Sequence, residues 1–169
     1  LDFFQRHSIQ GLEGVEGQSY WRNIQIDDCK GRLEVRHHPR RDALQLKLSH
    51  LGTEHLMPIV ANVRRMFDLD ATPTDISETL AQSPLFCQLD ERFPGTRAPG
   101  HWSLFECCVR GVVGQQISVA AARGVQAKLL MFCADEGEED PGFPTPQLLL
   151  ALPDEQLPMP NSRKQTLRS

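Results

Sequence analysis

The sequence lacks any long apolar segment. None of its apolar runs approaches the roughly 18 residues that a membrane-spanning helix needs, and no signal-peptide pattern stands at the N-terminus. The five cysteines are odd in number and scattered, with no Cys-x-x-Cys pair, which argues against a structural zinc site or a disulfide framework. We therefore predict a cytoplasmic protein that has no membrane partner and binds no metal.

The motifs of several enzyme classes are also missing. The sequence contains no Ser/His/Asp arrangement, no Walker loop and no Rossmann glycine pattern, and its spaced glycines Gly11, Gly14 and Gly17 precede a predicted strand. Two pairs of histidines, His37 with His38 and His50 with His55, have no cysteine or carboxylate at ligand spacing. Hydrolase triads and nucleotide-binding enzymes are thus disfavoured, and we predict no cofactor.

Basic residues are not in excess. The formal net charge is -4 and the isoelectric point is about 5.9, whereas a nucleic-acid-binding domain usually carries more basic than acidic groups. Positive charge is concentrated locally, in residues 36–41 and at Arg163, Lys164 and Arg168.

The N-terminal part alternates between apolar and polar residues. Three segments show this period of two, with apolar side chains at Tyr20, Ile24 and Ile26, at Leu33 and Val35, and at Leu44, Leu46 and Leu48. Their polar neighbours, Asn23 and Gln25 among them, are expected on a solvent-facing side. Turn residues at 27–31 and 37–42 separate the segments, which predicts an antiparallel meander.

Helical patterns follow the predicted strands. A helix is expected from Thr53, with Pro58 kinking it unless the helix start is shifted. Two short helices should occupy residues 72–93, separated at Ser83, and the Pro- and Gly-rich residues 94–100 form a linker. Strands followed by covering helices predict the α+β class.

A helix, a tight break and a second helix are predicted between residues 103 and 132. Ser103 and Glu106 have the spacing of a capping box. The first helix should bury Phe105, Cys108, Val109 and Val112, and the second, capped by Ser118, should bury Ala122, Val125, Leu129 and Phe132. Between them, Gln115 and Gln116 form an exposed polar corner.

This corner and five further segments, in the same order, give the chain a specific likeness. The segments are residues 3–13, 63–70, 93–100, 143–146 and 158–163. Together they resemble the bacterial 3-methyladenine DNA glycosylase II type of the helix-hairpin-helix DNA glycosylases. The resemblance implies an N-terminal α+β domain over residues 1–93, an antiparallel sheet with covering helices like one half of a TATA-binding protein. Residues 94–169 would be the start of the all-helical glycosylase domain.

The resemblance also implies an activity. Such enzymes excise alkylated bases from damaged double-stranded DNA in base excision repair, by hydrolysing the N-glycosidic bond of a flipped nucleotide. Their Gly-x-Gly hairpin and catalytic aspartate are not matched here, because no Gly-x-Gly follows Gly114. We therefore expect the catalytic aspartate beyond Ser169, and we expect this chain to be inactive alone.

The family's site residues can be carried over to matching positions. Gln116, with Gln115 beside it, would be the wedge that fills the space left by the flipped base. Phe3, or its neighbour Phe4, would line the pocket for a cationic base. Arg163 and Lys164 would contact phosphates. The alternatives are a turn-capping role for the glutamines, a core role for the phenylalanines, and simple solvation of the two basic residues.

Other functions stay open at this level. The chain could be a non-catalytic module for lesion binding or partner docking, or the glycosylase part of an alkylation-responsive activator fusion. An interrupted helical domain would leave an apolar patch on Val112, Val125 and Leu129, so self-association is also expected.

Overall fold

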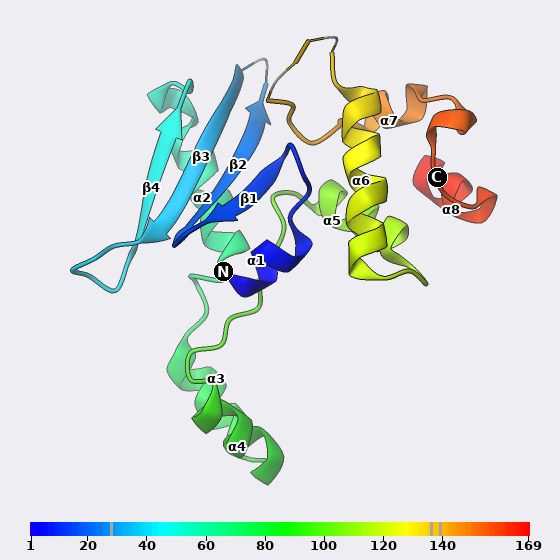
Figure 1. The fold of residues 1–169 in the computed structure, drawn as a ribbon. Helices are drawn as coiled ribbons and strands as arrows, with labels where there is room; N and C mark the ends of the chain where they lie inside the picture. The colour runs from blue at the N-terminus through cyan, green and yellow to red at the C-terminus, as the bar shows by residue number, and fades with distance from the viewer. Residues whose placement is uncertain (28, 136, 139) are drawn as a thin grey trace. The chain divides into compact units, whose positions relative to one another are not determined.

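The computed structural model describes residues 1–27, 29–135, 137–138 and 140–169. The chain forms two compact units, one of residues 1–55 with 105–169 and one of residues 56–104. The first contains a four-stranded antiparallel sheet and most of the helices, so the α+β class is confirmed (Figure 1). The domain boundary after residue 93 stays a prediction.

The sheet has the strand order β1-β2-β3-β4. The three predicted strands are present as β2 (Ser19–Ile26), β3 (Cys29–His37) and β4 (Leu44–Ser49). The edge strand β1 (Glu13–Glu16) was not predicted, because its Gly14 interrupts any apolar alternation. Gly14 is nevertheless suited to this place, since a Cβ there would lie 2.9 Å from Nε1 of Trp21 on the neighbouring strand.

One face of the sheet is buried as predicted, with Tyr20, Ile24, Leu33 and Val35 at most 2% exposed. The prediction for Asn23 was wrong, because this residue on the other face is only 1% exposed. Its amide donates to the carbonyl of Gly11 at 3.0 Å and to Oδ1 of Asp140 at 3.3 Å. The segment that follows the long helix α6 (Val119–Cys133) therefore covers part of the face expected to be in solvent.

The helices of the first unit include both of those predicted between residues 103 and 132. They are α1 (Asp2–His7), α5 (Leu104–Gly114), α6 (Val119–Cys133), α7 (Pro146–Ala151) and α8 (Asn161–Arg168), with short 3-10 turns at Thr53–His55 and Asp154–Gln156. Oγ of Ser118 accepts from the amide of Ala121 at 3.2 Å, which confirms the predicted cap of α6.

The buried faces of α5 and α6 differ in part from the prediction. Glu106, Val109 and Val113 are buried on α5, whereas Cys108 is exposed; on α6, Phe132 is 45% exposed. The face of α5 is turned because Glu106 takes part in buried ion pairs. On α6, Leu129 and Leu130 pack into two different clusters. The buried surface of this helix is therefore wider than predicted and rotated relative to the predicted face.

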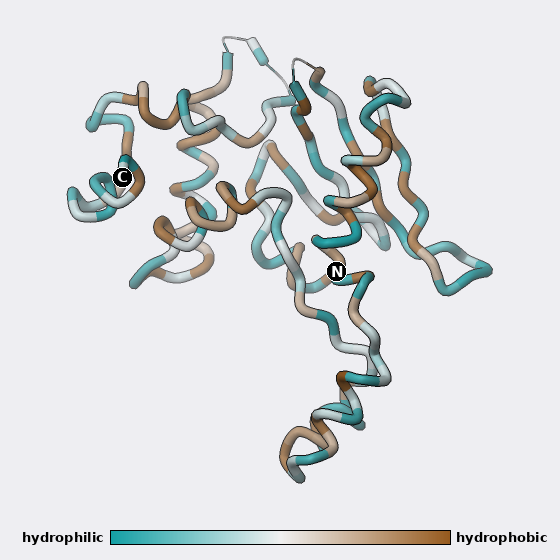
Figure 2. The backbone as a smooth tube through the Cα atoms, turned by 180° about the vertical axis from the view of Figure 1, so that it is seen from behind, coloured by the Kyte–Doolittle hydropathy of each residue, from teal (hydrophilic) through white to brown (hydrophobic). Residues whose placement is uncertain are grey.

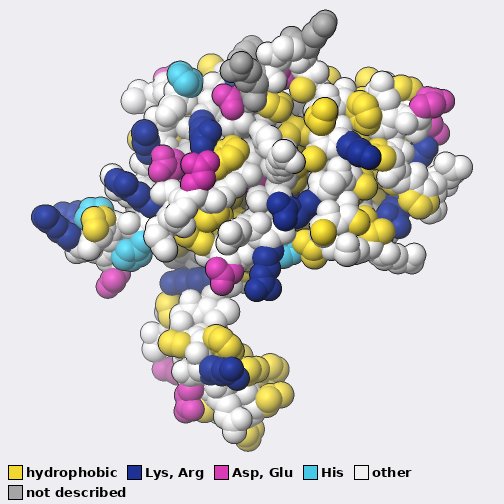
Figure 3. All heavy atoms as spheres, in the orientation of Figure 1, with side chains coloured by type: hydrophobic (Ala, Val, Ile, Leu, Met, Phe, Trp, Pro, Cys, Tyr) yellow, Lys and Arg dark blue, Asp and Glu magenta, His cyan; other side chains and the backbone are white. Residues whose placement is uncertain are grey.

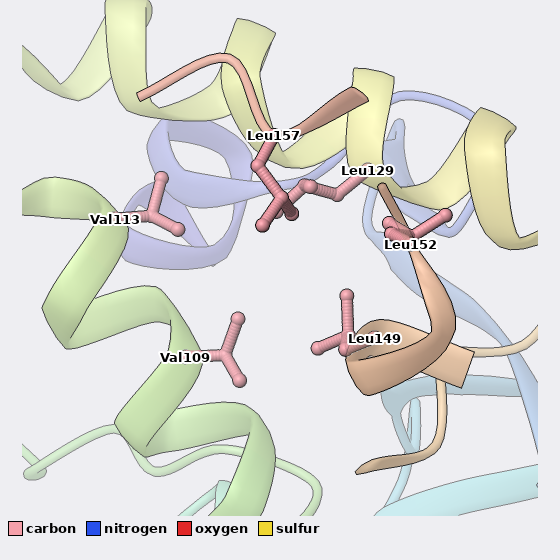
Figure 4. Close-up of a cluster of buried hydrophobic side chains, with 6 residues drawn as sticks. All are labelled: Val109, Val113, Leu129, Leu149, Leu152 and Leu157. Carbon is pink, nitrogen blue, oxygen red and sulfur yellow. The ribbon is translucent and has the colours of Figure 1, made fainter. Parts of the chain in front are cut away.

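The apolar patch predicted on Val112, Val125 and Leu129 does not form. Leu129 is 3% exposed within a cluster that also contains Val109, Val113, Leu149, Leu152 and Leu157 (Figure 4). Val125 packs against the same cluster. The helix α7 and the segment after it cover this surface. It therefore offers no exposed apolar patch that would favour self-association.

The second unit contains α2 (Leu56–Met66), α3 (Pro73–Leu80) and α4 (Pro84–Arg92). Because α2 begins only at Leu56, Pro58 lies in its first turn, where its missing amide has no intrahelical partner to lose, and no kink is required. The break before Pro84 is observed as predicted. In the described part of the chain, no helix is long and apolar enough to cross a membrane.

Candidate functional site

The corner between α5 and α6 presents two exposed glutamines, Gln115 and Gln116. Gln116 has a φ of 57°, in the left-handed region. This conformation costs an L-residue with a side chain roughly 1–2 kcal/mol, and glycine is the usual choice there. The turn by itself gives no reason for a long polar side chain, so the strained position is a functional candidate.

The corner is held firmly on both sides. The amide of Gln115 donates to the carbonyl of Val112 at 3.4 Å, and Ser118 caps α6. Nη1 of Arg163, from α8, donates to the carbonyl of Val113 at 3.5 Å. Arg163 therefore lies beside the end of α5 that leads into the corner.

The two basic candidates thus have structural contacts of their own. Arg163 caps α5, while Nζ of Lys164 donates to the backbone carbonyl of Asp154 at 2.7 Å. Their predicted phosphate contacts stay a prediction, with Arg163 the better placed of the two.

The aromatic candidates on α1 have different environments. Phe4 is 9% exposed and packs on Tyr20, with 4.9 Å between ring centroids, as a core residue does. Phe3 is half-buried, lies edge-on to Phe4 at 5.7 Å and stacks on the imidazole of His7 at 4.2 Å. Nδ1 of His7 donates to the carbonyl of Phe3 at 2.8 Å, which fixes that ring. Phe3 is therefore the ring with accessible surface, and Phe4 supports it.

Two arginines attach α1 to the helices that flank the corner. Arg110 of α5 donates from Nη1 to the carbonyl of His7 at 3.0 Å, and Arg123 of α6 donates from Nε to the carbonyl of Ser8 at 2.7 Å. Carbonyls at a helix C-terminus carry partial negative charge, which favours cationic donors. The structure thus builds Phe3 and the Gln116 corner onto one framework of three helices.

A buried ionic network, which no local sequence pattern predicts, holds α5 to the sheet. Its members are Glu13, Tyr20, Arg22, Glu106 and Arg110. Arg22 reaches Oε2 of Glu13 at 2.9 Å and forms a two-pronged pair with Glu106, with 3.0 Å from Nη1 to Oε1. Arg110 donates to Glu13 at 2.6 Å and to Glu106 at 2.8 Å. Two carboxylates face two guanidiniums, so the cluster is balanced in charge.

The electrostatics of this network stabilise its charged form. Burial acts to raise the pKa of Glu13, but Arg22 and Arg110 outweigh it and hold the pKa below its usual value. Burial and the neighbouring Glu13 raise the pKa of Tyr20, whose hydroxyl donates to Glu13 at 2.5 Å. Because these groups are buried, we assign them the task of positioning α5. Arg22 could have been noticed, since it lies in phase with the buried Tyr20 and Ile24.

Within the described residues, no group of three or more His, Cys, Asp or Glu side chains is arranged to hold a metal. The five cysteines are free thiols. Burial raises the pKa of Cys133 to about 11, so this thiol is a poor nucleophile at neutral pH.

Comparisons with known proteins show the family of the chain. Residues 1–103 match the model of the AlkA N-terminal domain, and the chain belongs to this family. It is 29% identical over 155 residues to DNA-3-methyladenine glycosylase 2 of Escherichia coli K12, covering 89% of this chain and 52% of that protein. It is 27% identical over 167 residues to a probable bifunctional transcriptional activator/DNA repair enzyme AlkA of Mycobacterium tuberculosis, covering 96% of this chain and 33% of that protein.

The fold is also shared with a solved structure. The 3-methyladenine DNA-glycosylase from Archaeoglobus fulgidus superposes with a TM-score of 0.82 at 20% identity, covering 99% of this chain and 60% of that one. The likeness confirms the fold. The chain spans about half the length, or less, of the curated relatives it matches.

Proposed function

We propose that this chain is the lesion-recognition part of a DNA glycosylase that removes alkylated bases such as 3-methyladenine by hydrolysis of the N-glycosidic bond. The observation that carries the proposal is Gln116. It is exposed and held in a left-handed conformation at a corner that Arg110 and Arg123 tie to the helix of Phe3.

Each residue has a distinct part in this function. Removing a base from the stack costs a few kcal/mol, and Gln116, with Gln115 beside it, offsets part of that cost by filling the vacated space. Phe3 binds the cationic ring of the flipped base by stacking and cation-π attraction, with Phe4 beneath it. Arg163 and Lys164 contact phosphates near the corner. No cofactor takes part.

The reaction itself is assigned to residues outside this sequence. A carboxylate that stabilises the positive charge developing on the sugar would complete the site. Residues 1–93 would form the α+β domain and residues 94–169 the start of the helical domain, in a protein acting on chromosomal DNA in the cytoplasm. The names of the relatives support the assignment of the chain to a DNA glycosylase.

Release of 3-methyladenine from methylated double-stranded DNA tests the proposal. The protein encoded by the whole reading frame around this sequence should release the base, whereas the 169-residue chain alone should not. Gln116→Ala should lower release at least about tenfold, because an unstacking cost of a few kcal/mol is no longer offset. Gln165→Ala, at an exposed position on α8, is the matched control.

Two results would contradict the proposal. One is efficient release by the 169-residue chain alone, which would place the chemistry within it. The other is an unchanged rate in the Gln116→Ala variant, which would leave the corner with a structural role.

A second function is favoured by the relative from Mycobacterium tuberculosis, whose name joins a transcriptional activator to a repair enzyme. In that case the reading frame would encode a regulatory domain as well as this chain. Methylation-dependent activation of a reporter gene by the complete protein would support it. Lesion binding without any base release by the complete protein would instead favour a non-catalytic recognition module.

A further inference from the structure

The hairpin between β3 and β4 carries positive charge that the proposed site does not use. Arg36 stands near the end of β3, Arg40 and Arg41 lie in the turn, and all three side chains are exposed. In the part of the chain that the structure describes, none of the three has a carboxylate partner; Arg36 donates only to Oε1 of Gln45, at 3.0 Å. The formal charge of the whole chain is -4, so this concentration of cations is local.

The turn that carries the arginines is ordered by its own hydrogen bonds. The amide of His38 donates to the carbonyl of Ala43 at 2.8 Å, and the amide of Arg40 donates to Nδ1 of His38 at 3.2 Å. The amide of Ala43 in turn donates to the carbonyl of Arg41 at 2.8 Å. A rigid turn loses less conformational entropy on binding than a flexible one.

A shallow hollow of about 290 Å³ lies beside this turn on the sheet surface. It is lined by Glu34, Arg36, Gln45, Leu46 and Lys47. Lys47 is 4.0 Å from Glu34, a loose and exposed ion pair, so two cations outweigh one carboxylate. Guanidinium groups bind phosphate oxygens in a bidentate geometry, and an ammonium adds a point charge.

The hairpin and the glutamine corner belong to the same unit. In Figures 1 and 2 the hairpin tip and the α5–α6 corner lie at a similar height along the lower edge of the sheet-and-helix unit, with α1 between them. The tip is hydrophilic in Figure 2, and Figure 3 shows Lys, Arg and His side chains gathered on it together with an acidic side chain. A duplex held at the corner would extend well beyond it, with one charge per about 1.7 Å of axis.

We infer that the β3–β4 hairpin is a second contact for the DNA backbone, in which Arg36, Arg40 and Arg41 bind phosphates of the duplex whose lesion lies at Gln116. The contact is independent of base sequence. The inference rests on the proposed function, because that function brings the duplex to the unit. An acidic protein fits less well, because residues 36–43 offer no Phe, Tyr, Trp or large aliphatic anchor of the kind that protein interfaces use.

The test measures the affinity of the complete protein for a 25-base-pair undamaged duplex at several salt concentrations. Each lost phosphate contact should lower the slope of log K against log salt by about 0.9, and the affinity at 0.1 M salt by about 8-fold. The double variant Arg40→Gln/Arg41→Gln should therefore lose about 1.8 from the slope. Arg40→Lys/Arg41→Lys should keep most of it, because the charges remain. Lys128→Gln, exposed on α6, is the control and should change little.

The melting temperature of each variant should equal that of the wild type, because the substituted side chains are exposed. An unchanged slope and affinity in the glutamine double variant would overturn the inference. So would a variant that loses affinity for polyglutamate but not for DNA, since the partner would then be an acidic protein. A wild-type protein that binds the duplex but releases no base would contradict the proposed glycosylase activity instead. The comparison of salt slopes would still decide whether the hairpin contacts phosphates.

Discussion

Removing the charge of Glu106 should destabilise the chain strongly. The residue is 0% exposed, and its carboxylate accepts hydrogen bonds from Arg22 and Arg110. Glu106→Gln keeps the shape but leaves Glu13 to balance two buried guanidiniums. Breaking a buried ion pair from one side costs about 3–5 kcal/mol.

The contacts give a similar magnitude. Glutamine keeps one oxygen, so at least one hydrogen bond to a charged donor is lost, at about 1.5–3 kcal/mol. Its amide hydrogens then point towards a guanidinium, which adds repulsion. Because domains of this kind are stable by only about 5–15 kcal/mol, the loss is a large fraction of the total.

Urea-induced unfolding measures this loss. The slope of the unfolding free energy against urea concentration should stay the same, because the variant exposes the same surface area on unfolding. Adding Arg110→Gln restores the charge balance, so the double variant should be more stable than the sum of the single losses by about 0.5–3 kcal/mol. Lys30→Gln, which removes the exposed pair with Glu138 at 2.6 Å, is the control and should cost less than about 1 kcal/mol. A loss below about 1 kcal/mol for Glu106→Gln, or strict additivity in the double variant, would refute this reasoning.

Three further predictions concern other positions. Gln116→Gly should stabilise the fold by about 1 kcal/mol, because its left-handed φ of 57° suits glycine, while base release falls; a lower melting temperature would contradict this. Gly31→Ala should destabilise by about 1–3 kcal/mol, because the new Cβ would lie 2.5 Å from the carbonyl oxygen of Ser49, and wild-type stability in urea would show that the backbone yields freely. The pKa of Glu13 is lowered on folding from its ordinary 4.5, so its contribution is complete above about pH 4.5 and is lost as the pH falls through the folded value. Unfolding measured from pH 3 to 7 should thus show a shallower acid loss for Glu13→Gln than for wild type, and parallel curves would argue against the network.

The local patterns of the sequence determined much of the fold. The alternation of apolar and polar residues with period two predicted β2, β3 and β4, because each of these strands has one face in the core and the other towards solvent. The Ser118 cap and the break around Gln115 and Gln116 could likewise be predicted, because both depend only on residues that are neighbours in the sequence. The family likeness was carried by short ordered segments and agrees with the match over residues 1–103.

The tertiary structure decided which faces meet. Arg22 and Glu106 are separated by 84 positions, and no local pattern shows that they form one buried pair. The burial of Asn23 likewise depends on Asp140, which lies 117 positions away. Which of Phe3 and Phe4 keeps accessible surface also depends on tertiary contacts, because Phe4 packs on Tyr20 of the sheet. Periodicity records whether a side chain prefers water, whereas its partner is selected by the packing of distant segments that satisfy each other's charge, shape and hydrogen bonds.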